Sequence, residues 1–445
     1  MRIIMKTICL AFLSVSLWSG EPPADGADYE SNWHQWRGPD ATGVAPHSNP
    51  PVNWSEEQNV RWKIEIPGKG HATPIIWGEK IFVLTAVPQE GGSEPPPPQD
   101  GQRRRRGIAP SSILNFEVMA LNRVDGSVIW QKTLREEFPH EGTHRDGTWA
   151  SNSPITDGEH LYAYFGSRGL YCLDLDGNLK WEKDFGEMRT RRGFGEGSSP
   201  AIYENTMIIN WDHEEADFVV ALDKRTGEEL WRKDRDEPTS WSTPLIVNVN
   251  GTPQVIINAT NYVRSYDIKT GDIIWESTGM TLNAIPSPVI EDGVVFLMSG
   301  FRGNALQAIR LEGAKGDVTG TEAILWDYDR DTPYVPSPLL YNGGLYFLKS
   351  NDGILTCFNT KTGERNYGPQ RLDGISNVYA SPVGAAGRVY FTGRQGGFLV
   401  IEAGNEFKIL AENKLDDMFD ASPAIAGNEI YLRGHKYLYC IAEGK

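Results

Sequence analysis

The chain has 445 residues, including 47 Gly, 28 Pro and 14 Trp, and its formal net charge is -16 at pH 7. This acidic balance argues against general nucleic-acid binding, which needs a basic surface. Gly and Pro supply turns and aromatic residues favour strands, so the composition indicates a β-rich globular protein.

The first twenty residues, MRIIMKTICLAFLSVSLWSG, have the pattern of a secretory signal peptide. Arg2 and Lys6 form a basic start, and the apolar run from Ile8 to Leu17 is shorter than a membrane span requires. We therefore expect an exported protein, periplasmic or extracellular, with residues 1–20 as the signal and no transmembrane span elsewhere. An uncleaved N-terminal anchor is the alternative.

A leader of residues 21–56 follows, with the sequence WHQWRGP at positions 33–39. Similar leaders occur in secreted bacterial proteins of the PQQ-like propeller class. This resemblance predicts that the leader packs on the folded domain as a plug or strap, with a ligand role as the alternative.

A low-complexity insertion at residues 88–112 contains prolines at 95–98 and arginines at 103–106. Its composition predicts an exposed, mobile loop. Docking of the arginines on an acidic surface polymer is the alternative.

A Ser-Pro or Thr-Pro pair recurs along the chain and opens an apolar run each time. The pairs are Thr73-Pro74, Ser153-Pro154, Ser199-Pro200, Thr243-Pro244, Ser287-Pro288, Ser337-Pro338, Ser381-Pro382 and Ser422-Pro423. After a first gap of 80 residues, which contains the insertion, the prolines are 46, 44, 44, 50, 44 and 41 residues apart. This period is typical of a four-stranded propeller blade.

Each unit has a third strand that ends in Asp or Asn, then a Gly turn, then a fourth strand that begins near Trp. In the clearest unit, Ala221 to Trp231, the turn is Thr226-Gly227. The other Trp positions are Trp130, Trp181, Trp275 and Trp326, with Tyr367 and Leu410 as apparent substitutes in two units. Burying such a side chain between blades contributes about 1.5–3 kcal/mol, so we expect these residues to be structural.

This order of small residue, Asp, Thr-Gly and Trp resembles the tryptophan-docking motif of PQQ-type repeats. The resemblance implies an all-β, eight-bladed propeller of four-stranded antiparallel blades over residues 57–445. The last unit, Pro423 to Ile441, lacks a strand with Trp, and the strand from Asn59 to Ile66 contains Trp62. We expect these segments to pair and close the ring, because pairing removes two exposed edges.

The cysteines that remain after export occupy the small-residue position of the second, sixth and eighth units. They are Cys172, Cys357 and Cys440. A disulfide needs Cα atoms within about 7 Å, and these units are not adjacent in a ring. We expect three free, buried thiols.

The segments just before each Ser/Thr-Pro pair are expected at the mouth of the central channel, because propellers carry function on loops of a rigid ring. The loops between the second and third strands are expected to open on the same face. Arginine recurs at one structural position in these loops, and converging guanidinium groups would bind a carboxylate or another anion. Pairing of these arginines with neighbouring Asp and Glu is the alternative. The candidate ligand-binding residues are Arg168, Arg302, Arg394, Arg433, Arg192, Trp241, Tyr379, His144 and Asp146.

His140, His144, Asp146 and His213 have the chemistry of metal ligands. The sequence does not fix their mutual distances, so we predict no metal site. The chain contains no nucleophile elbow, phosphate-binding Gly loop or zinc-protease motif, and we assign no catalytic residue.

Two propeller classes of different function resemble this chain. PQQ-dependent alcohol dehydrogenases hold PQQ and Ca²⁺ in the channel, under a vicinal Cys pair, but this chain has neither that pair nor a haem-binding Cys-x-x-Cys-His. The propeller lipoprotein of the outer-membrane protein assembly complex is a cofactor-free scaffold. We favour a monomeric, non-catalytic scaffold without a cofactor that binds a small anionic ligand or a protein at the channel mouth. The alternative is a PQQ-dependent alcohol or polyol dehydrogenase.

Overall fold

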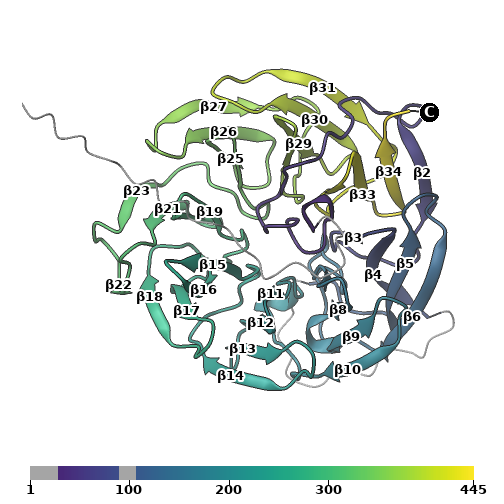
Figure 1. Cartoon of the computed structure of the whole chain (residues 1–445), viewed down its shortest axis with the longest axis horizontal. Coiled ribbons are helices and arrows are strands. Elements are labelled where there is room, and N and C mark those ends of the chain that lie inside the picture. Colours follow the sequence, from purple (N-terminus) through teal and green to yellow (C-terminus); the bar gives the residue numbers. More distant parts are fainter. Residues whose placement is uncertain (1–28, 90–106, 445) are drawn as a thin grey trace, which may run out of the picture.

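The structure is a computed structural model that describes residues 29–89 and 107–444. Within them the chain forms a ring of eight β-sheets (Figure 1). The expected signal peptide and most of the Pro- and Arg-rich insertion fall in residues 1–28 and 90–106, outside the described residues. The prediction of an all-β, eight-bladed propeller is confirmed. No helix in the described part is long and apolar enough to cross a membrane.

The blades follow one another along the chain, and each runs from an inner to an outer strand. Blade one has β3 (Ile75–Trp77), β4 (Lys80–Pro88), β5 (Leu114–Asn122) and β6 (Val128–Glu137). Blade two has β7 (Ile155–Thr156), β8 (His160–Tyr164), β9 (Leu170–Asp174) and β10 (Leu179–Lys183). Blade three has β11 (Ala201–Tyr203), β12 (Thr206–Trp211), β13 (Phe218–Asp223) and β14 (Glu229–Asp234). Blade four has β15 (Leu245–Val249), β16 (Thr252–Ile257), β17 (Val263–Asp267) and β18 (Ile273–Ser277), and β22 (Gly316–Asp317) joins its edge.

The remaining blades keep the same plan. Blade five has β19 (Val289–Glu291), β20 (Val294–Ser299), β21 (Ala305–Arg310) and β23 (Ile324–Tyr328). Blade six has β24 (Leu339–Tyr341), β25 (Gly344–Leu348), β26 (Ile354–Asn359) and β27 (Arg365–Arg371). Blade seven has β28 (Val383–Ala385), β29 (Arg388–Thr392), β30 (Gly397–Glu402) and β31 (Ile409–Lys414), with β1 (Val44–Ala45) beside β28. Three short 3-10 helices, η1 (Tyr29–Ser31), η2 (Gly166–Arg168) and η3 (Arg191–Gly193), lie in connections.

The ring closes between the two ends of the chain. Blade eight consists of β32 (Ala424–Ala426), β33 (Glu429–Arg433), β34 (Tyr437–Ala442) and, as its outer strand, β2 (Val60–Glu65). In Figure 1 the purple β2 lies beside the yellow β34. Trp62 is opposite Cys440, as the repeat alignment predicts.

The Ser and Thr residues of the repeated pairs form a belt of hydrogen bonds around the channel. The backbone N–H of each residue donates to the hydroxyl oxygen of the next blade's residue at 2.9–3.2 Å, from Thr73 through to Ser422. The Thr73 hydroxyl then donates to the Ser422 carbonyl oxygen at 3.2 Å. The proline that follows has no N–H of its own to satisfy. The repeated pair therefore joins each blade to the next.

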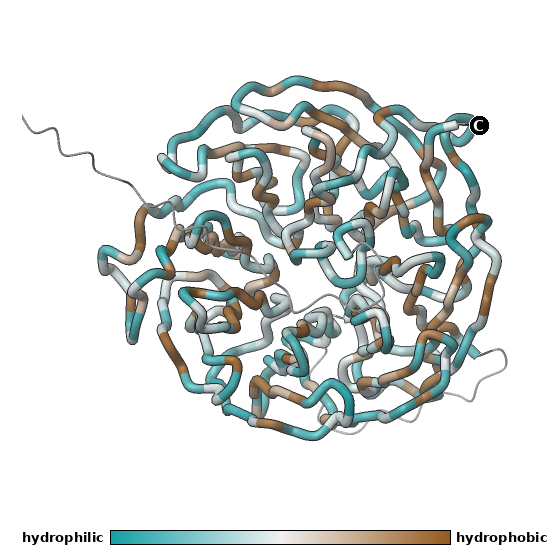
Figure 2. Tube along the Cα trace, viewed as in Figure 1, coloured by the Kyte–Doolittle hydropathy of each residue, from teal (hydrophilic) through white to brown (hydrophobic). Residues whose placement is uncertain are grey.

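Tryptophan and glycine form the outer joint between neighbouring blades. The Trp181 indole lies against Gly227 of the next blade, and its Nε1–H donates to the Lys224 carbonyl oxygen at 3.1 Å. Trp62, Trp130 and Trp231 make the same hydrogen bond to the turn of their next blade. In Figure 2 apolar residues recur along the strands of every blade.

Replacing Gly227 by Ala should loosen this joint. A Cβ on Gly227 would lie 2.8 Å from Cε3 of Trp181, and the residue has a φ of +74°. The left-handed conformation alone costs about 1–2 kcal/mol, and overpacking adds about 1–3 kcal/mol. Gly313 has a φ of +77° but nothing within 4 Å of its Cβ position, so Gly313→Ala isolates the backbone cost. Denaturant unfolding should show the larger loss for Gly227→Ala, and equal losses would contradict a packing role.

The Trp position of blade seven corrects one expectation from the sequence. A bulge places Ala411, and not Leu410, opposite Val400, while Leu410 is exposed. Trp54 of the leader packs against Tyr390 in the same core cluster, as Trp181 packs against Tyr162 in blade two. The leader thus supplies the indole that blade seven lacks.

The three cysteines of the described residues are free and buried, as predicted. Each lies opposite the aromatic residue of the outer strand, for example Cys172 opposite Trp181 and Cys357 opposite Tyr367. Burial raises the pKa of Cys172 and Cys440 to about 12 and that of Cys357 to about 11.

These thiols should not react with Ellman's reagent in the folded protein, because only the thiolate is nucleophilic. In a Cys9→Ser variant we expect almost no reaction in buffer and three reactive thiols after unfolding in guanidinium chloride. Rapid reaction of the folded protein would show that a blade opens locally.

Residues 29–56 lie across one end of the channel and touch several blades. Trp33 bridges to Ile76 of blade one, and the carbonyl oxygen of His34 accepts from the N–H of Thr156 in blade two. The buried Arg37 donates to the carbonyl oxygens of Pro338 and Pro382, which begin blades six and seven, at 2.6 and 2.9 Å. The role of the leader as a strap stays a prediction.

Candidate binding site

A cavity of about 220 Å³ lies in the channel, and residues from all eight blades reach it. The hydroxyls of the belt, except Thr73, contribute to its lining. The residue two positions before each Ser or Thr of the belt also lines it, as expected for the segments that precede the pairs. These residues are His71, Ser151, Gly197, Trp241, Ile285, Val335, Tyr379 and Asp420.

Aromatic side chains form much of the cavity wall, and Trp36 of the leader is one of them. Trp241 is fixed because its indole Nε1–H donates to the Gly195 carbonyl oxygen at 2.7 Å. Tyr334 stacks on Phe301 with ring centroids 4.8 Å apart. The wall is therefore rigid and mainly apolar.

Arg394 lies behind the opposite wall and joins two carboxylates. Its guanidinium contacts Asp146 at 2.6 Å and Asp420 at 3.2 Å. The Tyr379 hydroxyl donates to Asp146 at 3.0 Å, and burial raises the pKa of Tyr379 to about 12. Burial alone would raise the pKa of Asp146, but the hydrogen bond and charge of Arg394 outweigh it and lower that pKa. Arg394 is thus already neutralised by protein carboxylates.

The other arginines expected at the mouth do not line this cavity. Arg168 is 3% exposed and contacts Glu196 at 3.0 Å, while Arg302 is exposed and lies near the ring of Phe301. Arg433 is 1% exposed, has no hydrogen-bond partner within the described residues, and burial lowers its pKa to about 10. Arg192 lies in η3 with a φ of +59°. His144, Asp146, Trp241 and Tyr379 are the predicted residues that the structure brings together around the cavity.

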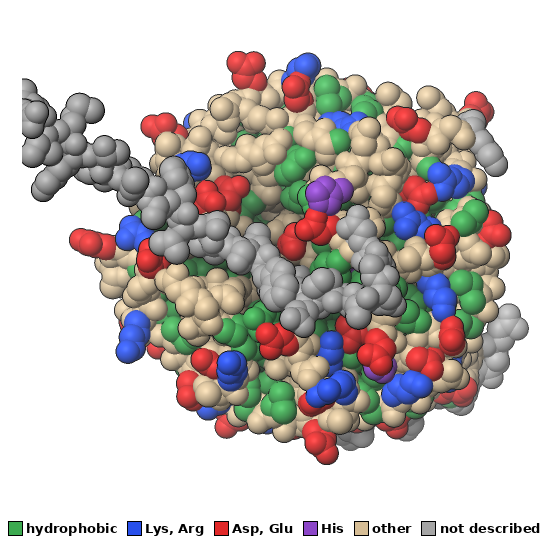
Figure 3. Space-filling view, in the orientation of Figure 1, with side chains coloured by type: hydrophobic (Ala, Val, Ile, Leu, Met, Phe, Trp, Pro, Cys, Tyr) green, Lys and Arg blue, Asp and Glu red, His purple; other side chains and the backbone are tan. Residues whose placement is uncertain are grey.

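On the face seen in Figure 3, acidic and basic side chains are interspersed. The alternative that the arginines pair with neighbouring Asp and Glu holds for Arg168 and Arg394. Within the described residues, neither Arg302 nor Arg433 forms such an ion pair.

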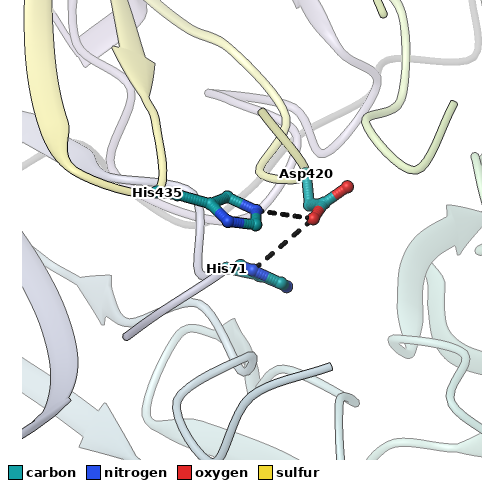
Figure 4. A group of neighbouring side chains, drawn as sticks. All are labelled: His71, Asp420 and His435. Atoms are coloured by element: carbon teal, nitrogen blue, oxygen red, sulfur yellow. Dashed lines mark hydrogen bonds and ion pairs between the residues drawn. The ribbon is translucent and has the colours of Figure 1, made fainter. Parts of the chain in front are cut away.

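Two histidines and an aspartate form a cluster at the edge of the cavity. His435 Nε2 lies 2.8 Å and His71 Nε2 lies 3.6 Å from Oδ2 of Asp420, and both imidazoles point toward that carboxylate (Figure 4). Burial lowers the pKa of His71 to about 4, although Asp420 acts to raise it. Asp420 Oδ1 is buried without a hydrogen-bond partner. His71 was not among the residues singled out from the sequence.

The residues considered as metal ligands from the sequence do not assemble. His140 Nε2 is 2.7 Å from the Met188 carbonyl oxygen, and its other nitrogen lies 3.2 Å from Arg168. His213 Nε2 is 2.9 Å from the Ala216 carbonyl oxygen, and its Nδ1 accepts the Arg189 N–H. His144 and Asp146 do meet, 3.6 Å apart, at the cavity.

Curated relatives of this chain share one name. The Shigella dysenteriae outer membrane protein assembly factor BamB is 23% identical over 63% of this chain and 78% of its own length. The factor of that name from Yersinia pestis is 25% identical over 54% of this chain and 58% of its own length.

Two solved structures share the fold. BamB from Moraxella catarrhalis covers 81% of this chain and 98% of its own, with a TM-score of 0.54 and 13% identity. The quinohemoprotein alcohol dehydrogenase ADHIIG from Pseudomonas putida HK5 covers 97% and 84%, with a TM-score of 0.58 and 11% identity. At these identities the likeness concerns the fold alone.

A family profile described as outer membrane protein assembly factor BamB matches residues 114–215 and 215–444, which include most of the repeats. The chain therefore belongs to the BamB family of PQQ-like propellers.

Proposed function

We propose that this protein is an exported, non-catalytic scaffold that binds a segment of another protein at the central cavity. The relatives are named assembly factors for outer membrane proteins, and such a factor acts on other polypeptides. The observation that carries the proposal is the cavity itself, because it presents aromatic rings and hydroxyls, while the charge of Arg394 is neutralised by Asp146 and Asp420. Aromatic anchors in desolvated pockets dominate protein–protein binding.

The size of the cavity also favours a protein segment. Pockets for small molecules measure roughly 300–1,000 Å³, whereas this one is about 220 Å³. That volume suits one or two apolar side chains of a partner that lies across the mouth. A small anion would have to displace Asp146 or Asp420 from Arg394 to find a cation in the cavity wall.

The dehydrogenase alternative needs PQQ and Ca²⁺, and the cavity residues do not fit that pair. Calcium takes six to eight oxygen ligands, largely from carboxylates. Of the three cavity carboxylates, Asp146 and Glu196 are bound to Arg394 and Arg168, and the Asp420 carboxylate alone cannot supply six to eight oxygens. A tricarboxylate cofactor would in addition require free cations.

The test is a titration of the folded protein with two kinds of probe. Short extended peptides with aromatic residues at alternate positions should quench Trp fluorescence. A Trp241→Ala variant should bind them about 10–100-fold more weakly, as expected for the loss of an interface anchor. Leu230→Ala, on an exposed outer strand, is the matched control and should bind normally.

PQQ with Ca²⁺ is the second probe. Stoichiometric PQQ binding together with alcohol-dependent reduction of a dye would overturn the scaffold in favour of the dehydrogenase. Failure of every aromatic peptide to bind would also refute the cavity as the protein site.

A further inference from the structure

The cluster of His71, Asp420 and His435 has the geometry of a metal site. One ligand atom from each residue lies within 4.8 Å of the other two. The two histidines reach Asp420 from different ends of the sequence, which ring closure brings together (Figure 4). We propose that these residues bind a first-row divalent transition ion of the zinc type.

The donor set selects this class of ion. Two imidazole nitrogens and one carboxylate suit Zn²⁺ and its neighbours, whereas Ca²⁺ and Mg²⁺ require mostly oxygen ligands. The His71 side chain is half-buried, and its Nε2 faces the same Asp420 carboxylate as Nε2 of His435. Asp420 Oδ1 has no hydrogen-bond partner, so this carboxylate has unused coordinating capacity.

The backbone around the cluster holds the ligands in place. The His435 N–H donates to the Met418 carbonyl oxygen at 2.8 Å, which ties the two loops that carry His435 and Asp420. Asp417 fixes the same turn by accepting two backbone N–H groups, from Lys436 and Tyr437, at 3.0 Å. The His71 N–H donates to the Ala150 carbonyl oxygen at 3.0 Å. A site built on such ties needs little rearrangement to bind an ion.

The nearby charges are compatible with a divalent cation. Arg394 contacts Asp420 at 3.2 Å and Asp146 more closely, at 2.6 Å. Arg394 would therefore retain a counter-charge when Asp420 binds a metal. Arg433 adds a buried positive charge, and Asp417 opposes it. The net formal charge around the cluster is -1, because three carboxylates (Asp420, Asp146 and Asp417) face two guanidinium groups (Arg394 and Arg433).

The coordination would leave one position open. Two of the three ligands, His71 and Asp420, line the cavity, so a fourth ligand could reach the ion from there. Three protein ligands with an open fourth position distinguish sites that bind water or a ligand from closed structural sites. A carboxylate, imidazole or thiolate that enters the cavity would complete the shell. This inference does not depend on the proposed scaffold role, because the ligands belong to the chain itself.

The test uses the full chain, stripped with a chelator and dialysed against Zn²⁺ or Co²⁺. We expect one ion per chain by elemental analysis and the visible absorption of four-coordinate Co²⁺, without the thiolate charge-transfer bands that the cysteines would give. His71→Ala, His435→Ala and Asp420→Asn should each weaken binding by more than the roughly 10–100-fold that loss of an outer partner costs.

His47→Ala is the control, because His47 is exposed and pairs with Glu30 away from the cluster. The His47→Ala variant should bind the metal ion with the affinity of the unmodified chain. His71→Gln and His435→Gln preserve side-chain volume and keep the test valid where an Ala variant fails to fold. No stoichiometric binding, or equal binding by the cluster variants and the unmodified chain, would overturn the proposal. Peptide binding to Trp241 would be unaffected by either result.

Discussion

Replacing Asp212 by Ala should destabilise the ring by about 3–5 kcal/mol, because it leaves a buried guanidinium without its counter-charge. Asp212 and Arg235 are both 0% exposed, and two contacts of 2.6 and 3.2 Å join them. The Ser240 hydroxyl and the Asn210 amide also donate to Asp212. Three donors therefore lose one acceptor at once.

Chemical denaturation with tryptophan fluorescence measures this loss. Asp272→Ala is the matched control, because Asp272 pairs with Lys233 while its side chain is 73% exposed, and such pairs contribute at most about 1 kcal/mol. A double variant, Asp212→Leu with Arg235→Met, should be less destabilised than Asp212→Ala, since it removes both charges. Equal losses in Asp212→Ala and Asp272→Ala would contradict the argument.

The ring was predictable because its joints repeat. Each blade carries its own Ser/Thr-Pro pair and most carry Trp and Gly at fixed spacing, so one interpretation applied to all blades and revealed the missing strand around Trp62. The physical role of Ser and Thr was not apparent, because their hydroxyl oxygens accept from backbone N–H groups of the preceding blade, 41–80 residues earlier in the sequence. Only the packed ring brings Thr73 and Ser422 together.

Part of the cavity lining could also be predicted from the sequence. The position two residues before each Ser or Thr lines the channel in every blade, and Trp241, Tyr379 and Asp420 could be found by that rule. Applied to the first pair, the same rule would have identified His71. His435 does not follow this rule, because it comes from the loop between β33 and β34, one of the loops between second and third strands that were expected on the same face.

Charge pairing could not be read from the sequence. The four arginines at the equivalent repeat position have different surroundings. Arg168 pairs with Glu196, and Arg394 joins two aspartates. Arg302 is exposed, whereas Arg433 is buried. These outcomes depend on acids that come from other loops. Spacing defines a backbone position, whereas the partner of a long side chain is set by packing.

Replacing Arg37 by Ala should cost about 3–5 kcal/mol, since it removes the fork that ties the leader to the ring. Arg37 is 2% exposed and donates to three carbonyl oxygens, those of Thr42, Pro338 and Pro382, at 2.6–2.9 Å. Burial lowers its pKa to about 9, so desolvation opposes the charged form. Hydrogen bonds from a charged donor contribute about 1.5–3 kcal/mol each, and an orphaned carbonyl costs about 1–3 kcal/mol, so the bonds outweigh that penalty.

Two readouts separate loosening of the leader from unfolding of the ring. Denaturant unfolding reports the whole domain, while limited proteolysis reports exposure of residues 29–56. Arg37→Lys keeps the charge but not the planar fork, so it should fall between the native protein and Arg37→Ala. Arg225→Ala, whose side chain is 60% exposed beside Asp223, should change stability by less than about 0.5 kcal/mol. If Arg37→Ala left both readouts unchanged, the leader would be an attachment to the ring and not a strap, since a strap must stabilise the blades that it joins.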